Sequence, residues 1–557
     1  MKVLGISDNH DSGAALLVDG ALVAAINQER IDRVKGSSAF PWGAIDAVLD
    51  RGQVRARDID RIVVGTSFTP SAFLRLFPNL HQKSKKSGQF SPLLHGYMLY
   101  QSALRRSGLH SWEIDGCKAI LEQRLKKRPF ENADLHLMDH HTAHAQGAYR
   151  TQEHAECLVL TLDAMGDGCS ATAWLGHNGI LRPLWEQSGL AAINLFYSQV
   201  TEFLGFRPLR HEGKITGLAA YVPPDPHLLG LFRTRIRFSN GRFNRMNIWK
   251  PSKTDDDFWF QVRSYSKETI AACAQSALEE ATLAFIEYWI RRTECGNLAL
   301  AGGVFANVRL NQKIAEIPGV RSIWIMPHMG DGGLAVGAAL GSLETEPKAL
   351  EHCYWGNEHN RTDRLRAIQR HNLQKTDQNI LEKAAALLSQ GCILGRSCGS
   401  MEWGPRALGN RSIIALPSDH GINDRLNAKL KRSEFMPFAP LVRYEDAEKY
   451  FINPSQAGRS AEFMTICMNT TPLFQQKCPA AVHVDKTARP QLLRRSVNPS
   501  LYDLLTEVEK KTGTGVLINT SLNMHEEPIT ATPDESIRAC KEAGLDGLLM
   551  DNYLLQW

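Results

Sequence analysis

The chain has 557 residues, of which 43% are hydrophobic and 22% are charged, as in an ordinary globular protein. It is too long for a single hydrophobic core, so we expect two large domains or more. The net charge of +5 is small for this length and does not by itself indicate a nucleic-acid partner. Phosphorylated small molecules would suit such a charge.

The sequence shows no signal for export or membrane insertion. The N-terminal MKVLGISDNHDSG lacks the apolar core of a signal peptide, because Asp8 and His10 interrupt it. No run of about 18 apolar residues occurs, so no membrane span is expected. The 11 cysteines include no CxxC pair, which is typical of reduced thiols and argues against a cysteine-built zinc site. We therefore expect a soluble, cytoplasmic protein with no membrane and no nucleic-acid partner.

Three short strands are predicted within residues 3–30, with a turn at Asp19-Gly20 between the second and the third. A similar order of strand, acidic loop, strand, turn and strand returns within residues 156–187. Each copy ends its first strand on an acidic residue, Asp8 or Asp163. The pattern indicates an internal duplication and resembles the actin-like ATPase architecture, in which duplicated halves clasp a nucleotide.

Residues 70–135, between the two copies, are predicted to form a polar, helical insertion with basic clusters such as Lys83 to Lys86. We interpret this cluster as a solvated face, and contact with an anionic acceptor or a partner is the alternative. Farther along, NLALAGG before ANVRLNQKIAEI and RSIWIMP before HMGDGGLAVGAAL each indicate a strand, a glycine-bearing loop and a helix. Such an arrangement points backbone N–H groups at phosphate.

Charged, irregular sequence over residues 351–375 is predicted to link a first domain, residues 1–350, to a second domain, residues 376–557. The second domain has strand-like segments in GCILGRS, SIIALP and GVLINTS and a helix-like segment in NILEKAAALLSQ. The fold class predicted for both domains is α/β.

Three histidines within DHHTAHA raise the question of a metal site. On a helix, His140 and His144 share one face because positions i and i+4 are neighbours, whereas His141 points elsewhere. Carboxylates must then come from other segments, and Asp163 and Asp331 stand at strand-to-loop junctions beside glycines. This set suits Fe(II), Mn(II) or Zn(II). The alternative is that the histidines are satisfied at a helix end.

Eleven ordered strings carry a resemblance to a known family. Those of the first domain are HDSGAALLVDG, NQERIDRVKGSSAFP, DHHTAHA, LDAMGDG, HEGKITGLAAY, LAGGVFANVRLN and MPHMGDGGLAVGAAL. Those of the second are MEWGPRALGNRSI, LNAKLKRSEFMPFAP, HVDKTARPQ and LINTSLNMHEEPI. As a set that spans essentially the whole chain, they resemble the NodU/CmcH/TobZ family of O-carbamoyltransferases, which includes nodulation-factor and antibiotic-tailoring enzymes.

The resemblance implies an actin-like (ASKHA) first domain similar to tRNA threonylcarbamoyl-transfer enzymes, and a YrdC-like second domain. The second domain would make carbamoyl adenylate from carbamoyl phosphate and ATP, normally with Mg²⁺. The first domain would hold Fe(II) and pass the carbamoyl group to a hydroxyl of a small-molecule acceptor, such as an antibiotic or a sugar. A homodimer is compatible with these expectations.

Carbamoyl phosphate is a small dianion, so its site requires several converging cations and N–H donors. The resemblance implies that residues of the second domain form this site, namely Arg406, Lys431, Arg489, Asn519 and Ser521. Further candidates beside them in the sequence are Arg411, Arg432 and Thr520. The alternative for each cation is a surface ion pair.

The first domain is expected to hold the adenylate at a strand-to-helix turn formed by Gly302, Gly303 and Asn307. Glu212 and Lys214, within HEGKITGLAAY, are expected to shape the nucleotide pocket.

Two residues near the N-terminus are candidates for catalysis. His10 follows the first strand, and an ordinary histidine pKa of about 6.5 suits it to accept the proton of the acceptor hydroxyl. Lys35 would neutralise the developing oxyanion or hold the acceptor. The alternatives are a loop histidine bonded to backbone and a surface lysine.

The sequence departs from the family pattern at three positions. Met436 stands where arginine is usual and removes one cation from the expected anion site, while Ala164 and Glu526 stand where glycine is usual.

Two other functions compete with carbamoyl transfer. The first is transfer of a threonylcarbamoyl group to tRNA adenosine, which the second domain opposes. The second is a non-catalytic, actin-like nucleotide-binding protein, which the cluster of His10, His140 and Asp163 opposes. A further hypothesis is an internal channel between the two sites, because carbamoyl adenylate is labile in water.

Overall fold

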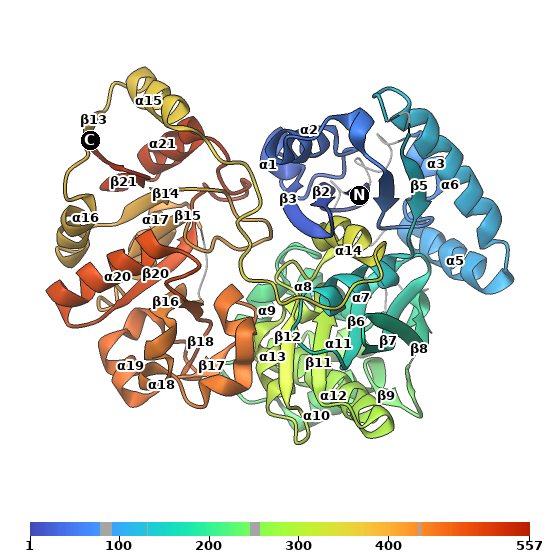
Figure 1. The fold of residues 1–557 in the computed structure, drawn as a ribbon. Coiled ribbons are helices and arrows are strands. Elements are labelled where there is room, and N and C mark those ends of the chain that lie inside the picture. Colours follow the sequence, from blue (N-terminus) through green and yellow to red (C-terminus); the bar gives the residue numbers. More distant parts are fainter. Residues whose placement is uncertain (78–91, 131, 245–256, 433–435) are drawn as a thin grey trace.

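The structure is a computed structural model that describes residues 1–77, 92–130, 132–244, 257–432 and 436–557. The chain forms two halves that lie side by side (Figure 1). The first half contains two five-stranded sheets, and the second contains one eight-stranded sheet. Helices pack on these sheets, so the fold is mixed α/β. The basic cluster Lys83 to Lys86 lies outside the described residues.

The first sheet has the strand order β3-β2-β1-β4-β5. Its strands are β1 (Lys2–Ser7), β2 (Gly13–Val18), β3 (Ala21–Asn27), β4 (Arg61–Val64) and β5 (Asp134–Leu137). Strand β1 pairs antiparallel with β2 and parallel with β4. Apolar side chains such as Leu4 and Leu16 pack against Ile45 of α2 (Trp42–Gly52), which covers one face of the sheet.

The second sheet has the strand order β12-β11-β6-β7-β8. Its strands are β6 (Cys157–Gly166), β7 (Cys169–His177), β8 (Ile180–Ser188), β11 (Asn297–Ala301) and β12 (Ser322–Ile325). In both sheets the strands lie in the order third, second, first, fourth and fifth. The pairings also match, since the first three strands are antiparallel and the first, fourth and fifth are parallel.

Two helices lie between these sheets. Helix α14 (Leu334–Gly341) packs on β1 and β2, and α7 (His140–Arg150) packs on β6 and β11. The two helices also pack on each other. A Cβ at Gly337 would lie 2.0 Å from the carbonyl oxygen of Ala143, so only glycine permits this approach. The close packing places the N-terminal end of α7 between the loops that follow β1 and β6.

The remaining helices of the first half surround this centre. The insertion contributes α3 (Ala72–Leu76), α5 (Pro92–Ser107) and α6 (His110–Leu125). Between β8 and β11 the chain forms α8 (Ile193–Phe203), α9 (Glu212–Leu218), α10 (Pro226–Arg235), α11 (Asp257–Val262) and α12 (Lys267–Thr293). Helix α13 (Val308–Ala315) lies between β11 and β12 in the chain. A short hairpin of β9 (Phe238–Ser239) and β10 (Arg242–Phe243) and the short helix α1 (Glu29–Asp32) complete this half.

The second half is built on a mixed sheet of order β13-β22-β21-β14-β15-β20-β16-β19. Its strands are β13 (Gln374–Thr376), β14 (Leu394–Ser397), β15 (Arg411–Ala415), β16 (Ala439–Arg443), β19 (Gln491–Leu493), β20 (Val516–Ser521), β21 (Gly547–Met550) and β22 (Tyr553–Gln556). Two further short strands, β17 (Met468–Asn469) and β18 (Thr487–Ala488), pair with each other.

Helices cover both faces of the eight-stranded sheet. One face carries α16 (Ile380–Ser389) and α20 (Pro499–Thr512), whose apolar side chains form one core with the sheet. The other face carries α15 (Arg361–Arg370), α17 (Ile422–Lys429) and α21 (Pro533–Glu542), which form another core. The short helices α18 (Ala447–Tyr450) and α19 (Pro472–Lys477) pack on each other, and residues of both contribute to the core cluster that includes the second sheet.

The segment predicted as a linker, residues 351–375, is irregular only up to residue 360. Helix α15 begins there because Asn360 and Asp363 form a capping box, in which each side chain binds the backbone N–H of the other residue. Strand β13 then forms the edge of the eight-stranded sheet, where it pairs with β22. The last part of the predicted linker therefore belongs to the second half.

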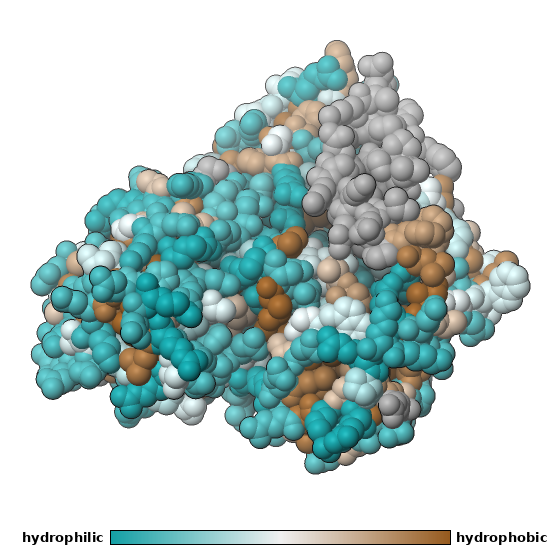
Figure 2. All heavy atoms as spheres, turned by 90° about the horizontal axis from the view of Figure 1, so that it is seen from above, coloured by the Kyte–Doolittle hydropathy of each residue, from teal (hydrophilic) through white to brown (hydrophobic). Residues whose placement is uncertain are grey.

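No helix among the described residues is long and apolar enough to cross a membrane. The face shown in Figure 2 is mainly hydrophilic, with separate hydrophobic patches.

Candidate functional site

Helix α7 begins directly after Asp139, whose side chain caps it. The Asp139 Oδ1 atom accepts a hydrogen bond from the backbone N–H of Thr142 (3.0 Å), and Oδ2 pairs with Arg105 Nη1 (2.7 Å). The helix places the rings of His140 and His144 side by side, with centroids 4.7 Å apart. Both side chains are almost completely buried.

Two carboxylates face these imidazoles. Asp163 lies in β6, and Asp331 begins the short helix η4 (Asp331–Gly333). His144 Nε2 lies 3.1 Å from Asp163 Oδ2 and 3.7 Å from Asp331 Oδ1, and His140 Nε2 lies 3.6 and 3.7 Å from the same two atoms. One ligand atom from each of the four residues lies within 4.8 Å of the other three. The structure thus brings together all four residues that the sequence singled out for a metal.

The bonding state of these side chains fits a metal ion. Within the described part of the chain, both ring nitrogens of His140 and the Nδ1 atom of His144 are buried without a hydrogen-bond partner. Buried polar atoms are normally paired, so three unpaired imidazole nitrogens in one cluster need an explanation. Two imidazoles and two carboxylates suit Fe(II), Mn(II) or Zn(II), and a cation bound by His140 Nε2 would satisfy that atom.

The imidazoles and carboxylates of the cluster shift one another's pKa values. Burial acts to lower the pKa of His140, but the carboxylates of Asp331 and Asp163 outweigh it and raise this pKa to about 9. Burial acts to raise the pKa of Asp163, but the two imidazoles outweigh it and hold this pKa well below its usual value. The cluster therefore keeps a carboxylate ready to bind a cation.

The residues around the cluster hold it in place. Asn9 Nδ2 donates to Asp331 Oδ2 (3.2 Å), so the loop after β1 orients a carboxylate that lies 322 residues farther along the chain. His141 is bonded to Thr161 Oγ1 (2.7 Å) and to the carbonyl oxygen of Cys169 (3.1 Å), and burial lowers its pKa to about 3. His141 therefore points away from the cluster, as expected. Asn9 was not predicted, although it adjoins His10 in the same loop.

The two predicted catalytic residues lie near the cluster but outside it. His10 Nδ1 is 3.5 Å from Asp11 Oδ1, and about a third of the His10 side chain is exposed. Lys35 is exposed, and its carbonyl oxygen accepts a hydrogen bond from Arg210 Nη2 (2.7 Å). Their roles in catalysis stay predictions.

The predicted adenylate residues lie next to Asp163. Gly302 has φ 102°, and a Cβ there would meet the carbonyl oxygen of Leu162 at 2.1 Å, so this turn requires glycine. A Cβ at Gly303 would lie 3.2 Å from Asp163 Oδ1. Asn307 caps α13 and exchanges hydrogen bonds with the side chain of Gln275 (2.8 and 3.2 Å). Gln275, on α12, was not predicted, because 32 residues separate it from Asn307.

Glu212 and Lys214 lie at the start of α9. Glu212 Oε1 accepts hydrogen bonds from Ser198 Oγ (2.7 Å) and from the backbone N–H of Leu209, and burial raises the pKa of its carboxyl group. Lys214 is buried, with its Nζ atom 5.7 Å from the centre of the Phe206 ring. Their contacts with a nucleotide stay predictions.

In the second half, Arg406 and Arg489 lie beside each other. The guanidinium of Arg489 is the main cause that lowers the pKa of Arg406 to about 9, with burial adding to the effect. Among the described residues, no carboxylate oxygen lies within 4 Å of either guanidinium. Both arginines are half-buried. Two such cations side by side without a counterion are unfavourable unless an anion joins them, so this pair has the properties of an anion site.

Asn519 and Ser521 lie on β20, near the same end of the sheet. Asn519 Nδ2 donates to Gln491 Oε1 (2.7 Å), and its buried Oδ1 atom has no hydrogen-bond partner in the described structure. Arg432, rather than Lys431, reaches toward Ser521, with Nη2 to Oγ at 3.5 Å. Lys431 is exposed and has a left-handed backbone, with φ 54°.

A cavity of about 390 Å³ lies between the two halves. Gln275 and Arg309 of the first half line it together with Arg489 and Met436 of the second. The predicted anion site therefore opens into a cavity that also contacts Gln275, the residue hydrogen-bonded to Asn307. Met436 adds an apolar surface to this wall, where the family usually has an arginine.

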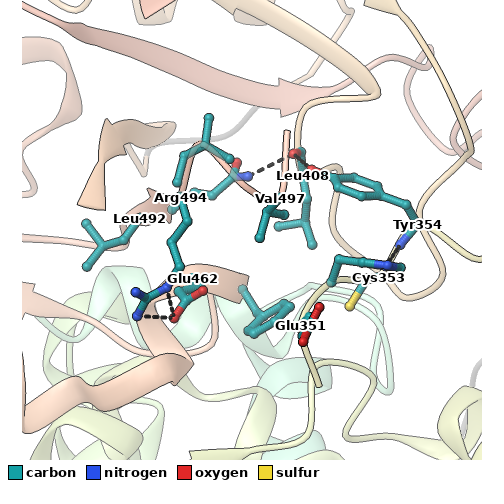
Figure 3. Close-up of a pocket in the computed structure, with 12 residues that line it drawn as sticks. Glu351, Cys353, Tyr354, Leu408, Glu462, Leu492, Arg494 and Val497 are labelled. Atoms are coloured by element: carbon teal, nitrogen blue, oxygen red, sulfur yellow. Dashed lines mark hydrogen bonds and ion pairs between the residues drawn. The ribbon is translucent and has the colours of Figure 1, made fainter. Parts of the chain in front are cut away.

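A second cavity, of about 20 Å³, lies between residues 351–354 and the second half (Figure 3). Arg494 and Glu462 form an ion pair at its edge (3.1 Å). A cavity of this size holds about one water molecule, and it contains none of the predicted site residues.

Comparison with known families assigns both halves of the chain. Residues 2–340 match the family described as the carbamoyltransferase N-terminus, and residues 385–557 match the carbamoyltransferase C-terminus. The chain belongs to the carbamoyltransferase family. This carbamoyltransferase is therefore a transferase, and the family supports transfer of a carbamoyl group, as the sequence motifs predicted.

Relatives of this carbamoyltransferase align over nearly its whole length. An uncharacterised protein of Methanocaldococcus jannaschii is 33% identical over 100% of this chain and 99% of its own. Nodulation protein NolNO of Sinorhizobium fredii is 28% identical over 98% of this chain and 79% of its own. Nodulation protein U of the same organism is 26% identical over 94% of each chain.

Proposed function

We propose that this carbamoyltransferase is an ATP-dependent O-carbamoyltransferase with two cooperating sites. The second half, which we take to be YrdC-like, makes carbamoyl adenylate from carbamoyl phosphate and ATP. The first half, which we take to be a duplicated actin-like unit, transfers the carbamoyl group to a hydroxyl of a small natural product. The matching order of the two five-stranded sheets supports the duplication.

The observation that carries this proposal is the pair of Arg406 and Arg489. Arg489 lines the cavity between the halves, and no described carboxylate neutralises either guanidinium. Paired arginines present forked N–H donors that match phosphate oxygens. Asn519, Ser521 and Arg432 add further polar groups at this end of the sheet. We assign the binding of carbamoyl phosphate to this site, with Lys431 as an exposed cation near its edge.

The first reaction activates the carbamoyl group. Water hydrolyses carbamoyl phosphate, the bond between its carbonyl group and its phosphate group breaks, and phosphate and carbamate form. A carbamate oxygen then attacks the α-phosphorus of ATP. The bond from this phosphorus to pyrophosphate breaks, and carbamoyl adenylate forms. The positive charge of Arg406 and Arg489 stabilises the negative charge that develops on the phosphate oxygens, and Mg²⁺ bound to ATP assists.

The second reaction transfers the carbamoyl group. The acceptor hydroxyl oxygen attacks the carbamoyl carbon, the bond to AMP breaks, and His10 accepts the hydroxyl proton. Lys35 stabilises the oxyanion, while Gly302, Gly303 and Asn307 bind the adenylate beside Asp163. His140, His144, Asp163 and Asp331 would hold a divalent cation such as Fe(II), which supplies Lewis acidity toward a phosphate or carbonyl oxygen.

The cavity of about 390 Å³ supports a direct passage of carbamoyl adenylate between the halves, because both halves line it. A nucleophile such as hydroxylamine, added to the solution, should then trap little of the intermediate. Efficient trapping from bulk solvent would contradict the passage.

The central test follows pyrophosphate release from ATP. We expect release only when carbamoyl phosphate is present, and the label of ¹⁴C-carbamoyl phosphate should reach an alcohol without threonine or tRNA. Replacement of both Arg406 and Arg489 by alanine should lower the rate of release at least about 100-fold, because two charge-assisted contacts are lost. Arg495→Ala is a matched control, since Arg495 is an exposed arginine paired with Asp503. Release of ADP without carbamoyl phosphate would contradict the proposal.

A further inference from the structure

A second group of basic residues lies on the surface between the two halves. The carboxylate of Glu526, from the second half, lies 3.3 Å from Arg210 Nη1, 3.8 Å from Arg207 Nη1 and 3.7 Å from His211 Nε2, all in the first half. Lys35 also interacts with Glu526 electrostatically. We call Lys35, Arg207, Arg210, His211 and Glu526 the interdomain basic cluster.

The interdomain basic cluster carries more positive than negative charge. Arg207 and Arg210 lie within 4 Å of the Glu526 carboxylate, and Lys35, whose pKa burial lowers, also acts on this carboxylate. Glu29, the next acidic residue near Lys35, is already bound to Arg30 Nη1 (3.1 Å) and to the backbone N–H of Gly36 (2.8 Å). Asp11 Oδ1 lies beside Arg210 as well, because a Cβ at Gly36 would be 3.1 Å from Arg210 Nη2 and 3.3 Å from Asp11 Oδ1. Three basic side chains therefore face two carboxylates, Glu526 and Asp11, which leaves a surplus positive charge that attracts anions.

The contacts of Glu526 are loose. None of its basic partners lies closer than 3.3 Å, whereas charge-assisted hydrogen bonds normally measure about 2.7–2.9 Å. The neighbouring Glu527 binds Arg538 Nη2 at 2.8 Å, so the same loop can form a tight pair. Glu526 is also 40% exposed and has a left-handed φ of 62°, a conformation that costs energy for a residue other than glycine. An external anion could therefore displace it.

The position of the cluster suggests which anion this is. Arg432 lies among the charges that act on Lys35, and its guanidinium also contacts Thr520 and Ser521 on β20. Arg432 therefore connects the cluster, which includes the partly exposed Arg207 and Glu526, with the proposed anion site of the second half. An anion of several linked phosphates is long enough and charged enough to contact cations spread over such a path.

We propose that the interdomain basic cluster binds a polyphosphate group and that Glu526 competes with it for the same cations. This inference rests on the proposed function, in which ATP enters and pyrophosphate leaves. The group is either the departing pyrophosphate or the triphosphate of incoming ATP. Glu526 neutralises part of the positive charge when no polyphosphate is bound.

The test measures the affinity of the full-length protein for pyrophosphate by isothermal titration calorimetry at low ionic strength. Glu526→Gln should bind pyrophosphate about fivefold to tenfold more tightly than the unchanged protein, because one competing charge is removed. Glu527→Gln is the matched control and should show no gain. Arg210→Gln added to Glu526→Gln should remove the gain, and higher salt should reduce it. Thermal unfolding of each variant would show that the fold is kept.

Further titrations identify the ligand and show whether the interdomain basic cluster binds it independently of Arg406 and Arg489. A gain for both pyrophosphate and ATP supports a pyrophosphate exit, and a gain for ATP alone supports a triphosphate site. An equal gain for AMP would overturn the proposal, as would equal affinities of Glu526→Gln and Glu527→Gln. The gain in pyrophosphate affinity should persist when Arg489 is replaced by alanine. Its disappearance would mean that the interdomain basic cluster is not a site separate from Arg489. These are binding measurements, so failure of the proposed reaction would show itself separately, in the pyrophosphate-release assay.

Discussion

Both five-stranded sheets have an aspartate in or directly after the last part of the first strand, but the surroundings of the two differ. Asp8 directly follows β1, and Asp163 lies within β6. In the first sheet, Asp8 is buried and paired with Arg75 through two contacts of 2.9 and 3.0 Å. In the second sheet, Asp163 faces His140 and His144, and its neighbour across the cluster is another carboxylate. One aspartate has a permanent counterion, whereas the other has titratable partners.

The difference shows how a single architecture can serve stability in one place and chemistry in another. A guanidinium cannot leave and does not lose its proton near neutral pH, so the pair of Asp8 and Arg75 is closed to ligands. Imidazoles can exchange a proton for a metal ion, so the environment of Asp163 stays open to one. Arg75 comes from α3 of the insertion, and the insertion therefore completes the first sheet.

The largest expected effect comes from breaking the buried ion pair of Asp8 and Arg75. Asp8→Asn should lower the free energy of unfolding by about 3–5 kcal/mol, because it leaves the buried Arg75 guanidinium without its counterion. Chemical denaturation followed by circular dichroism measures this change. Asp58→Asn is the control, since its partner Arg55 is largely exposed, solvent screens this pair, and its loss should lower the free energy of unfolding far less. Equal effects of the two substitutions would contradict the structural role of Asp8.

The next effect concerns Asp163, the aspartate that faces the two imidazoles. Asp163→Asn should weaken binding of Co(II), used as a spectroscopic probe for Fe(II), by about 100-fold, because an anionic ligand is replaced by a neutral one. Visible absorption of Co(II) measures the affinity. Asp8→Asn, studied below its unfolding range, should keep the affinity of the unchanged protein. Unaltered Co(II) binding by Asp163→Asn would show that the cluster is not a metal site.

A smaller effect is expected at the junction of the two sheets. His328 Nε2 bonds to Asn27 Oδ1 (3.2 Å), and burial lowers the pKa of His328 to about 4. The folded pKa lies below the unfolded value, so the unfolded chain binds more protons as the pH falls below about 6.5. Its share of the stability is therefore complete at neutral pH, and about 2 kcal/mol should be lost between pH 7 and pH 5.

Unfolding experiments at both pH values, with the unchanged protein and with His328→Gln, measure this share. The variant should lose less stability on acidification, by the amount that His328 contributes. An identical pH dependence of the two proteins would show that His328 titrates normally.

The smallest effect is expected at Ala164, which stands where the family usually has glycine. Its backbone N–H donates to Asp163 Oδ1 (2.6 Å), and glycine preserves this bond. Ala164 does not have a left-handed backbone, so alanine causes no strain there. Ala164→Gly should therefore change the affinity for Co(II) by less than about twofold, which is within about 0.5 kcal/mol. A larger change would mean that the flexibility of this loop controls the cluster.

Much of the fold could be predicted from the sequence because local patterns determine it. Apolar alternation and Gly-bearing turns predicted β1 to β3 and β6 to β8, and the i, i+4 spacing brought His140 and His144 together. The start of α15 was missed although its capping box is visible in the sequence, as Asn360 followed three residues later by Asp363.

Contacts between distant segments could not be predicted in the same way. Arg75 lies 67 residues from Asp8, and Gln275 lies 32 residues from Asn307, and no local pattern links either pair. The sequence also could not tell which of two adjacent cations, Lys431 or Arg432, turns toward Ser521. That choice depends on the left-handed backbone of Lys431, which residue type does not indicate.

The contact between η6 (Pro454–Phe463) and β12 has a consequence for producing the halves separately. Ser460 Oγ accepts a hydrogen bond from the backbone N–H of Ile325 (3.1 Å) and donates to the carbonyl oxygen of Ile323 (3.0 Å), both in the edge strand β12. A truncated chain ending near residue 350 would leave this strand uncovered, with unpaired backbone groups and apolar neighbours. Such an edge recruits other strands, so the fragment should aggregate on expression unless the missing half is supplied.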